Sequence, residues 1–125
     1  MGIYEEKLEG GEFDWFAQDN EGNIALFATA GAGNIPKPVI ECYKEHELIS
    51  EILESPNWGS SEVWMDYAAL GFFVYDWKLN NGPYIKKCDP ASKMDNELRT
   101  KILAIKDLPK LQLRFLEISE IHDVY

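Results

Sequence analysis

The 125-residue chain is short of cysteine, of long apolar runs and of basic side chains, and each shortage removes a class of protein. Its two cysteines, Cys42 and Cys88, lie in unlike local patterns, so we expect separate reduced thiols rather than a disulfide framework. No apolar run approaches the roughly 18 residues that cross a bilayer. The first residues also lack the cationic and apolar segments of a secretory signal. We therefore expect a cytoplasmic protein without a membrane partner.

Basic residues are scarcest in the first part of the chain. The sequence has 12 Lys and Arg against 22 Asp and Glu, for a formal net charge of −10. Residues 1–76 hold 15 acidic and 3 basic side chains, whereas residues 77–125 are nearly balanced. Binding to a phosphate backbone needs clustered Lys and Arg, so this charge argues against a nucleic-acid ligand. It favours a basic protein partner instead.

Recognisable catalytic and cofactor motifs are missing as well. The glycine-rich segment 29–34 precedes a predicted helix, but Pro36 stands where a dinucleotide-binding loop has its third glycine. Cys42 and His46 are one helical turn apart, yet no second ligand pair accompanies them, and we expect His46 to lie in solvent. Neither a nucleophile elbow nor a Cys–His pair indicates covalent catalysis. The sequence therefore identifies no metal, no cofactor and no catalytic residue.

The apolar and aromatic content, 46% and 13%, is enough for one hydrophobic core. Two hairpins are predicted by turn residues between aromatic runs, with Gly22 in the left-handed conformation of the first turn. We predict one α+β domain over residues 1–125, with a mostly antiparallel sheet of four to six strands and two or three helices packed on one face. The predicted strands are 13–18, 23–29, 72–79, 84–88 and 111–118. The predicted helices are 38–54, a shorter one that is capped by Ser60 or Ser61 and ends at Gly71, and 96–105.

The two hairpins share an aromatic-Asp-Trp segment, at residues 13–15 and again at residues 75–77. If these strands lie side by side, Asp14 and Asp76 share a surface, where paired carboxylates do acid–base work or bind a basic group. In the alternative, both acids only alternate out of the sheet while their aromatic neighbours face the core. A pocket between sheet and helices would draw on Asp14, Tyr67, Tyr75 and Asp76.

A partner-binding surface is the other candidate site. Trp58 lies in a loop next to acidic residues, where an exposed tryptophan is a natural anchor for a protein partner. The residues predicted to face a basic partner are Asp14, Asp19, Glu21, Glu41, Glu45, Glu47, Glu51, Glu54 and Trp58.

Four segments together resemble a group of small bacterial proteins, some of which look like immunity proteins of polymorphic-toxin systems. They are FDWFA (13–17), EGNIALF (21–27), TAGAGNIP (29–36) and GFFVYDW (71–77). The resemblance implies a non-enzymatic protein that binds a toxin, and it assigns no catalytic residue. Our first hypothesis is therefore a binding protein that neutralises a basic toxin by covering its surface. The alternatives are a small ligand-binding domain or enzyme, and a structural or assembly protein that forms a homodimer.

Overall fold

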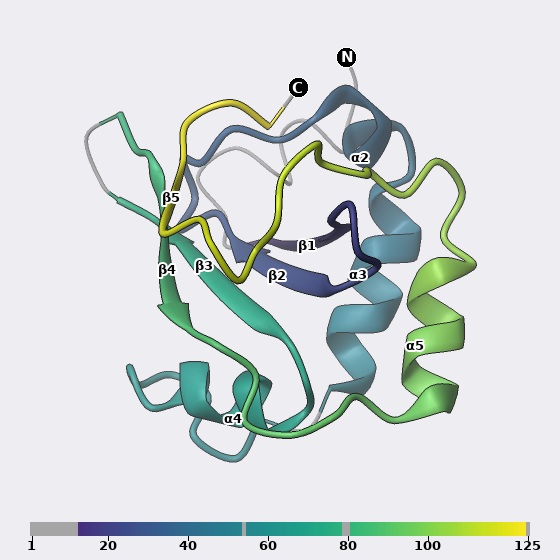
Figure 1. Ribbon diagram of the computed structural model, residues 1–125, viewed down its shortest axis with the longest axis vertical. Coiled ribbons are helices and arrows are strands. Elements are labelled where there is room, and N and C mark those ends of the chain that lie inside the picture. The colour runs from purple at the N-terminus through teal and green to yellow at the C-terminus, as the bar shows by residue number, and fades with distance from the viewer. Residues whose placement is uncertain (1–12, 54, 79–80, 125) are drawn as a thin grey trace.

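A computed structural model describes residues 13–53, 55–78 and 81–124 of the chain. Five strands form one open sheet in the order β1-β2-β3-β4-β5 (Figure 1). Only β2 and β3 run parallel, and the other neighbours are antiparallel. The predicted α+β fold is thereby confirmed. The strands are β1 (Asp14–Gln18), β2 (Ile24–Ala28), β3 (Phe73–Trp77), β4 (Tyr84–Cys88) and β5 (Glu120–Ile121), and the described helices are α2 (Lys37–Glu41), α3 (Tyr43–Ile52), α4 (Val63–Ala69) and α5 (Asn96–Leu103).

Both predicted hairpins are present. The β1–β2 turn has Gly22 at φ +82°, a conformation that glycine adopts without strain. The β3–β4 turn has positive φ at Asn81 and Gly82, as its Asn-Gly sequence predicts, while residues 79 and 80 lie outside the described part of the chain. Local turn chemistry therefore determines the two antiparallel pairs.

The predicted long helix is two helices, because the backbone breaks at Cys42 (φ −120°, ψ 30°). His46 and Ile49 are buried against β1, whereas Leu48 and Ile52 are exposed. The prediction that His46 lies in solvent is wrong. Its Nδ1 accepts a hydrogen bond from the Phe16 amide at 3.1 Å.

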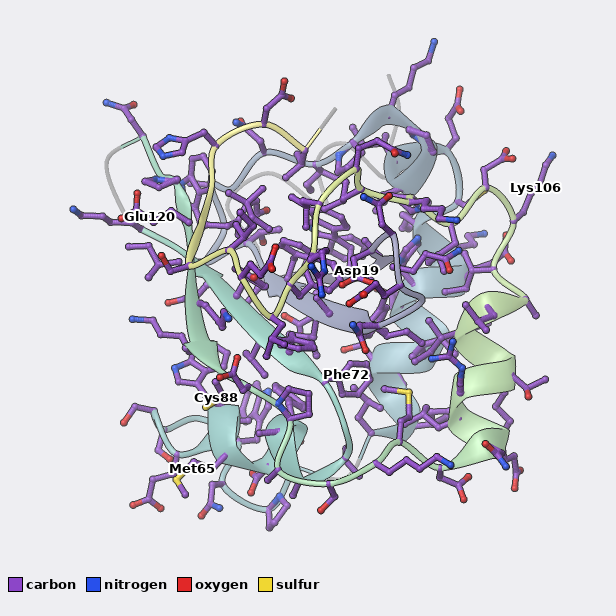
Figure 2. All side chains as sticks on the ribbon, viewed as in Figure 1. Asp19, Met65, Phe72, Cys88, Lys106 and Glu120 are labelled. Carbon is purple, nitrogen blue, oxygen red and sulfur yellow. The ribbon has the colours of Figure 1, made fainter. Side chains whose placement is uncertain are left out.

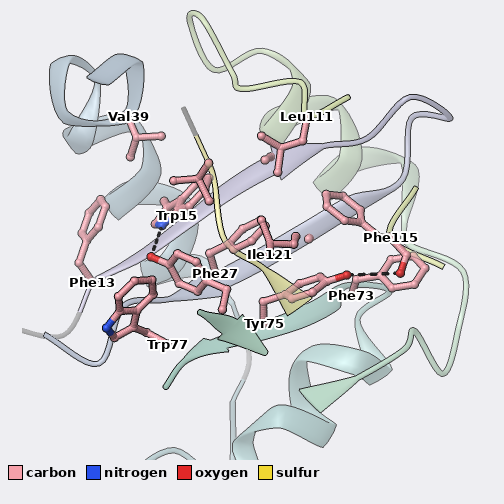
Figure 3. Packing of buried hydrophobic residues seen from close by; sticks show 14 residues of the cluster. Phe13, Trp15, Phe27, Val39, Phe73, Tyr75, Trp77, Leu111, Phe115 and Ile121 are labelled. Atoms are coloured by element: carbon pink, nitrogen blue, oxygen red, sulfur yellow. Dashed lines mark hydrogen bonds between the residues drawn. The ribbon is translucent and has the colours of Figure 1, made fainter. Parts of the chain in front are cut away.

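Each face of the sheet has its own hydrophobic cluster. Helices α3, α4 and α5 cover one face, which we call the helix face, with Phe16, Leu26 and Val74 beneath them. The opposite face is covered largely by residues 109–124, which we call the C-terminal strap (Figure 1). The strap face holds a ring cluster in which Trp15 and Phe27 stack at 4.2 Å between ring centroids (Figure 3).

The C-terminal strap was predicted to be a strand over residues 111–118, and that prediction is wrong. The segment is irregular, with a single bridge between Gln18 and Lys110. Leu111 and Phe115 are buried four residues apart, and Leu116 is exposed. The backbone of residues 109–118 bonds to the β1–β2 hairpin and within its own turns, and the strap pairs with β4 further on, at β5. The apolar residues of segment 111–118 therefore do not alternate.

Two predictions from the sequence concern the cysteine thiols and membrane-spanning segments. Cys42 and Cys88 are both free thiols, as predicted. Among the described helices, none combines the length and the apolar character needed to cross a membrane.

Candidate functional site: an acidic and aromatic pocket

A pocket of about 610 Å³ lies on the helix face, where the parallel strands β2 and β3 end. This volume falls within the range of ordinary ligand pockets, about 300–1,000 Å³. The sheet contributes its floor, and α4 with the loop before it contributes a wall. The lining residues are Asp14, Ala28, Ala30, Trp58, Gly59, Ser60, Ser61, Val63, Trp64, Tyr67 and Asp76.

Strand register brings the two aspartates into this pocket. Asp14 of β1 pairs with Ala28 of β2, and Ala28 pairs in turn with Asp76 of β3. The three residues form one row across the sheet, and the two half-buried carboxylates stand on either side of a methyl group. Because successive side chains of a strand alternate between faces, the aromatic neighbours of both aspartates pack on the strap face. The repeated aromatic-Asp-Trp segment thus serves the core and the pocket at once.

Trp58 stands at the pocket with 73% of its surface exposed. Its loop is nevertheless held firmly, because both the backbone and the side-chain amide of Asn57 donate to the Asp66 carboxylate of α4 at 2.8 Å. Gly59 follows at φ +94°, which turns the chain back toward α4. A large apolar side chain is therefore presented to solvent on a fixed backbone, next to the half-buried Trp64.

Two predicted site residues do not reach this pocket. Tyr75 is fully buried on the strap face, where its hydroxyl lies within hydrogen-bond distance of the carbonyl oxygen of Phe115, at 3.3 Å (Figure 3), and of that of Ile118. Asp19 is fully buried in the β1–β2 turn (Figure 2). Its carboxylate accepts hydrogen bonds from the amides of Glu21, Asn23 and Phe115 at 2.8–2.9 Å, which joins the hairpin to the C-terminal strap. Asp19 is therefore structural and cannot face a partner.

The remaining acidic candidates lie outside the pocket lining. Glu41 of α2 and Glu51 of α3 are exposed. Glu45 is half-buried and accepts a hydrogen bond from the Lys106 amide, and Glu47 is half-buried as well. Glu21 is exposed and forms an ion pair with Arg114 at 3.2 Å. Glu54 lies outside the described residues.

The cysteines and the buried histidine do not have the properties of a reactive nucleophile or of a metal site. Burial raises the pKa of both cysteine thiols, which disfavours the reactive thiolate. Burial also lowers the pKa of His46 to about 4, so this ring is neutral at pH 7. Within residues 13–53, 55–78 and 81–124, no three His, Cys, Asp or Glu side chains gather as a metal site would require.

The glycine-rich loop is packed rather than open. The amides of Ala32 and Gly33 both donate to the carbonyl oxygen of Thr29. A Cβ atom at Gly33 would lie 2.6 Å from the hydroxyl oxygen of Tyr84, so glycine is needed there for close approach. These amides are therefore not arranged to hold a phosphate.

Sequence reasoning identified Asp14, Trp58, Tyr67 and Asp76 but missed the rest of the lining. The lining residues that it missed include Trp64 of α4 and the two serines, Ser60 and Ser61, in the loop before that helix. The small side chain of Ala28 lies between Asp14 and Asp76 in the row across the sheet, but no local sequence pattern marks that position. Comparison with known protein families, with curated proteins and with solved structures finds no match to this chain.

Proposed function

We propose that this chain is a cytoplasmic, non-enzymatic binding protein whose pocket receives a basic group of a protein partner. The observation that carries the proposal is the pocket itself, whose lining combines Asp14 and Asp76 with the exposed ring of Trp58. Two carboxylates favour a cation, and tryptophan is the aromatic side chain that attracts cations best. Trp58 also has the features of an interface anchor, since it offers a large contact area with little entropy left to lose.

The charge of the whole chain supports the same reading. The net charge is −10, and the acidic excess falls in residues 1–76, which supply every lining residue of the pocket. Exposed carboxylates outside the pocket, such as Glu41 and Glu51, add to the field that attracts a basic surface. Such long-range attraction raises the association rate more than it raises the final affinity. The pocket would then determine how long the complex lasts.

The resemblance to immunity proteins indicates which partner to expect. A toxin with a basic surface would be bound through the pocket and its rim, and its own active site would be covered. This arrangement needs no catalytic group in the present chain. It agrees with the raised pKa values of the cysteine thiols and with the neutral, buried His46.

The test begins with affinity capture from the native cell at low salt, followed by identification and purification of the captured protein. Its dissociation constant is then measured by calorimetry for the wild type and for Trp58→Ala. Removal of an anchoring tryptophan typically costs about 2 kcal/mol or more, so we expect binding at least about 30-fold weaker. Met65→Ala is the matched control, because Met65 is 67% exposed on α4 but does not line the pocket (Figure 2).

The control should bind within about 3-fold of the wild type, as most exposed contacts do. Equal affinity of the wild type and the Trp58→Ala variant for the purified partner would contradict the proposal. So would a partner whose affinity does not fall as salt is added, because the complex depends on opposite charges.

A second candidate function is the binding of a small cationic molecule, and the pocket volume of about 610 Å³ favours it. One basic side chain does not fill that space. A purified partner that is indifferent to Trp58→Ala, together with a small cation that binds in the pocket, would favour this second function.

A further inference from the structure

We infer that the exposed face of α3 is a self-complementary surface that binds a second copy of this chain. In the resulting dimer, the two α3 helices run antiparallel about a two-fold axis beside Leu48. The inference goes beyond the proposed function, because no residue of α3 lines the pocket. It depends on two exposed apolar side chains, on two exposed charges of opposite sign and on their spacing along the helix.

Two large apolar side chains of α3 point away from the core. Leu48 is 62% exposed and Ile52 is 51% exposed, whereas Ile49 between them is buried. Residues four apart lie on the same side of a helix, so Leu48 and Ile52 form one apolar stripe. Single exposed leucines are common on protein surfaces, but a contiguous stripe leaves apolar area in water that a second surface would cover.

Two charges accompany the stripe, because Lys44 and Glu51 are each one helical turn from Leu48. Both side chains are exposed, and among the described residues neither forms an ion pair. Their seven-residue separation is about 10.5 Å along the helix axis, which is too far for them to pair with each other.

The stability of α3 itself does not explain these two charges. Lys44 is a cation in the first turn, where the helix macrodipole favours an anion. Glu51 is an anion in the last turn, where the macrodipole favours a cation. Each charge therefore lies at the less favourable end of α3, and a role between molecules accounts for both.

An antiparallel pair of helices makes the charges complementary. With the axis between residues 47 and 48, Lys44 and Glu51 each lie about 5 Å from the centre, in opposite directions along the helix. Lys44 of each copy therefore faces Glu51 of the other copy, so the dimer contains this ion pair twice. The two Leu48 side chains meet at the axis between the ion pairs, and Ile52 extends the apolar contact outward. One surface thus supplies both halves of the contact, as a two-fold dimer requires.

The size of the face indicates a weak dimer. Ten residues of α3 give a face of about 15 Å by 10 Å, which is much smaller than the roughly 800 Å² that each partner buries in a standard interface. We therefore expect a dissociation constant between about 10 μM and 1 mM, and a dimer that weakens as salt is added.

Sedimentation equilibrium of the full chain, from about 10 μM to about 1 mM at low salt, measures the dimer directly. Leu48→Ala should weaken it at least about 5-fold, because both copies lose apolar contact at the axis. Leu116→Ala is the matched control, since Leu116 is also 62% exposed but lies on the C-terminal strap. The control should stay within about 2-fold of the wild type.

Charge reversal tests the antiparallel arrangement. Lys44→Glu and Glu51→Lys each bring like charges together, so each variant alone should dimerise at least about 10-fold more weakly. An equimolar mixture of the two variants restores opposite charges and should associate within about 3-fold of the wild type. Both substitutions suit the macrodipole of α3 better than the native residues do, so lost dimerisation would not reflect a lost helix.

Three results would overturn the inference: a chain that stays monomeric at about 1 mM, equal effects of Leu48→Ala and Leu116→Ala, or a mixture that does not recover. General repulsion between acidic chains predicts a different pattern, in which Lys44→Glu weakens association and Glu51→Lys strengthens it.

The dimer and the proposed function fail in different ways. Trp58→Ala should dimerise like the wild type, so a purified partner that is indifferent to Trp58 contradicts the proposed function and leaves the dimer standing. If the chain stays monomeric while that partner binds Leu48→Ala more weakly than Leu116→Ala, the α3 face belongs to the partner and the dimer is wrong.

Discussion

Acid is expected to destabilise the protein through His46. This side chain is fully buried, and burial lowers its pKa from 6.5 to about 4. In the unfolded chain the ring titrates near pH 6.5, so the unfolded state takes up the proton first as pH falls. The contribution of the neutral ring is therefore complete above pH 6.5, and it is lost progressively as pH falls from 6.5 to 4.

The hydrogen bonding of His46 gives a structural reason for this cost. Nδ1 accepts from the Phe16 amide at 3.1 Å, which leaves the ring hydrogen on Nε2. Nε2 is itself buried and has no hydrogen-bond partner among the described residues. A protonated ring carries hydrogens on both nitrogens, so Nδ1 would face the Phe16 N–H as a second donor. Protonation thus removes the hydrogen bond between the Phe16 amide of β1 and the His46 ring of α3.

The magnitude follows from the pKa values. A pKa lowered from 6.5 to about 4 corresponds to about 3 kcal/mol of stability, at about 1.4 kcal/mol for each pH unit between them. About 2 kcal/mol of this is lost by pH 5. The loss is a large part of the total for a small domain, which is about 5–15 kcal/mol.

Urea unfolding between pH 7.5 and pH 4.5 measures the effect, with His46→Gln as the comparison. Glutamine keeps an acceptor but does not titrate, so the difference between the two proteins removes the contribution of the carboxylates. We expect the wild type to lose about 2 kcal/mol more than the variant by pH 5. Parallel curves, or a folded-state His46 resonance that titrates near pH 6.5, would refute the reasoning.

Two further substitutions test the fold by unfolding in denaturant. Asp19→Ala leaves three amides without their acceptor, including the buried amide of Phe115, and should cost about 3 kcal/mol, against about 1 kcal/mol for Asp95→Ala, which removes only the exposed N-cap of α5. Similar losses at both sites would show that Asp19 is not the link to the C-terminal strap. Gly71→Ala should cost at least about 1 kcal/mol more than Gly59→Ala. Both glycines have positive φ, but only at Gly71 would a Cβ lie 2.6 Å from the backbone of Met94, and equal losses would contradict this packing.

The features predicted from the sequence are those set by neighbouring residues. Gly22 and the Asn81-Gly82 pair determine their turns locally, and Asp95 begins α5 by accepting from the amides of Glu97 and Leu98. The repeated aromatic-Asp-Trp segment suggested a surface shared by Asp14 and Asp76 if their strands were neighbours; β2 lies between those strands, and register still places the two residues in one row. Both strands pair with β2, and both aspartates pair with Ala28. Because side chains in one row of a sheet point to the same face, the two aspartates lie on one face.

The features that sequence reasoning missed depend on distant contacts. Residues 111–118 of the C-terminal strap show apolar alternation, but their backbone bonds to the β1–β2 hairpin and within their own turns instead of forming a ladder. His46 was predicted to face solvent because it is polar. It lies one turn before the buried Ile49 on α3, and its Nδ1 accepts a hydrogen bond from the distant Phe16 amide. Asp19 resembled a surface acid, because the Phe115 amide that donates to its carboxylate lies 96 residues away in the sequence. No local pattern contains that information.

The central claim is that Asp14 and Asp76 together bind a basic group of the partner. Its most direct test is the dissociation constant of the purified partner for Asp14→Asn with Asp76→Asn, measured beside Glu97→Gln with Glu120→Gln, at two exposed carboxylates outside the pocket lining. Both variants remove two negative charges, so a purely long-range electrostatic effect would weaken the binding of both to the same extent. We predict at least about 30-fold weaker binding for the pocket pair, in line with about 2 kcal/mol or more for a charge pair buried at an interface, and less than about 3-fold for the outer pair, whose exposed charges are worth about 1 kcal/mol or less. Equal effects of the two pairs on the dissociation constant would contradict the account.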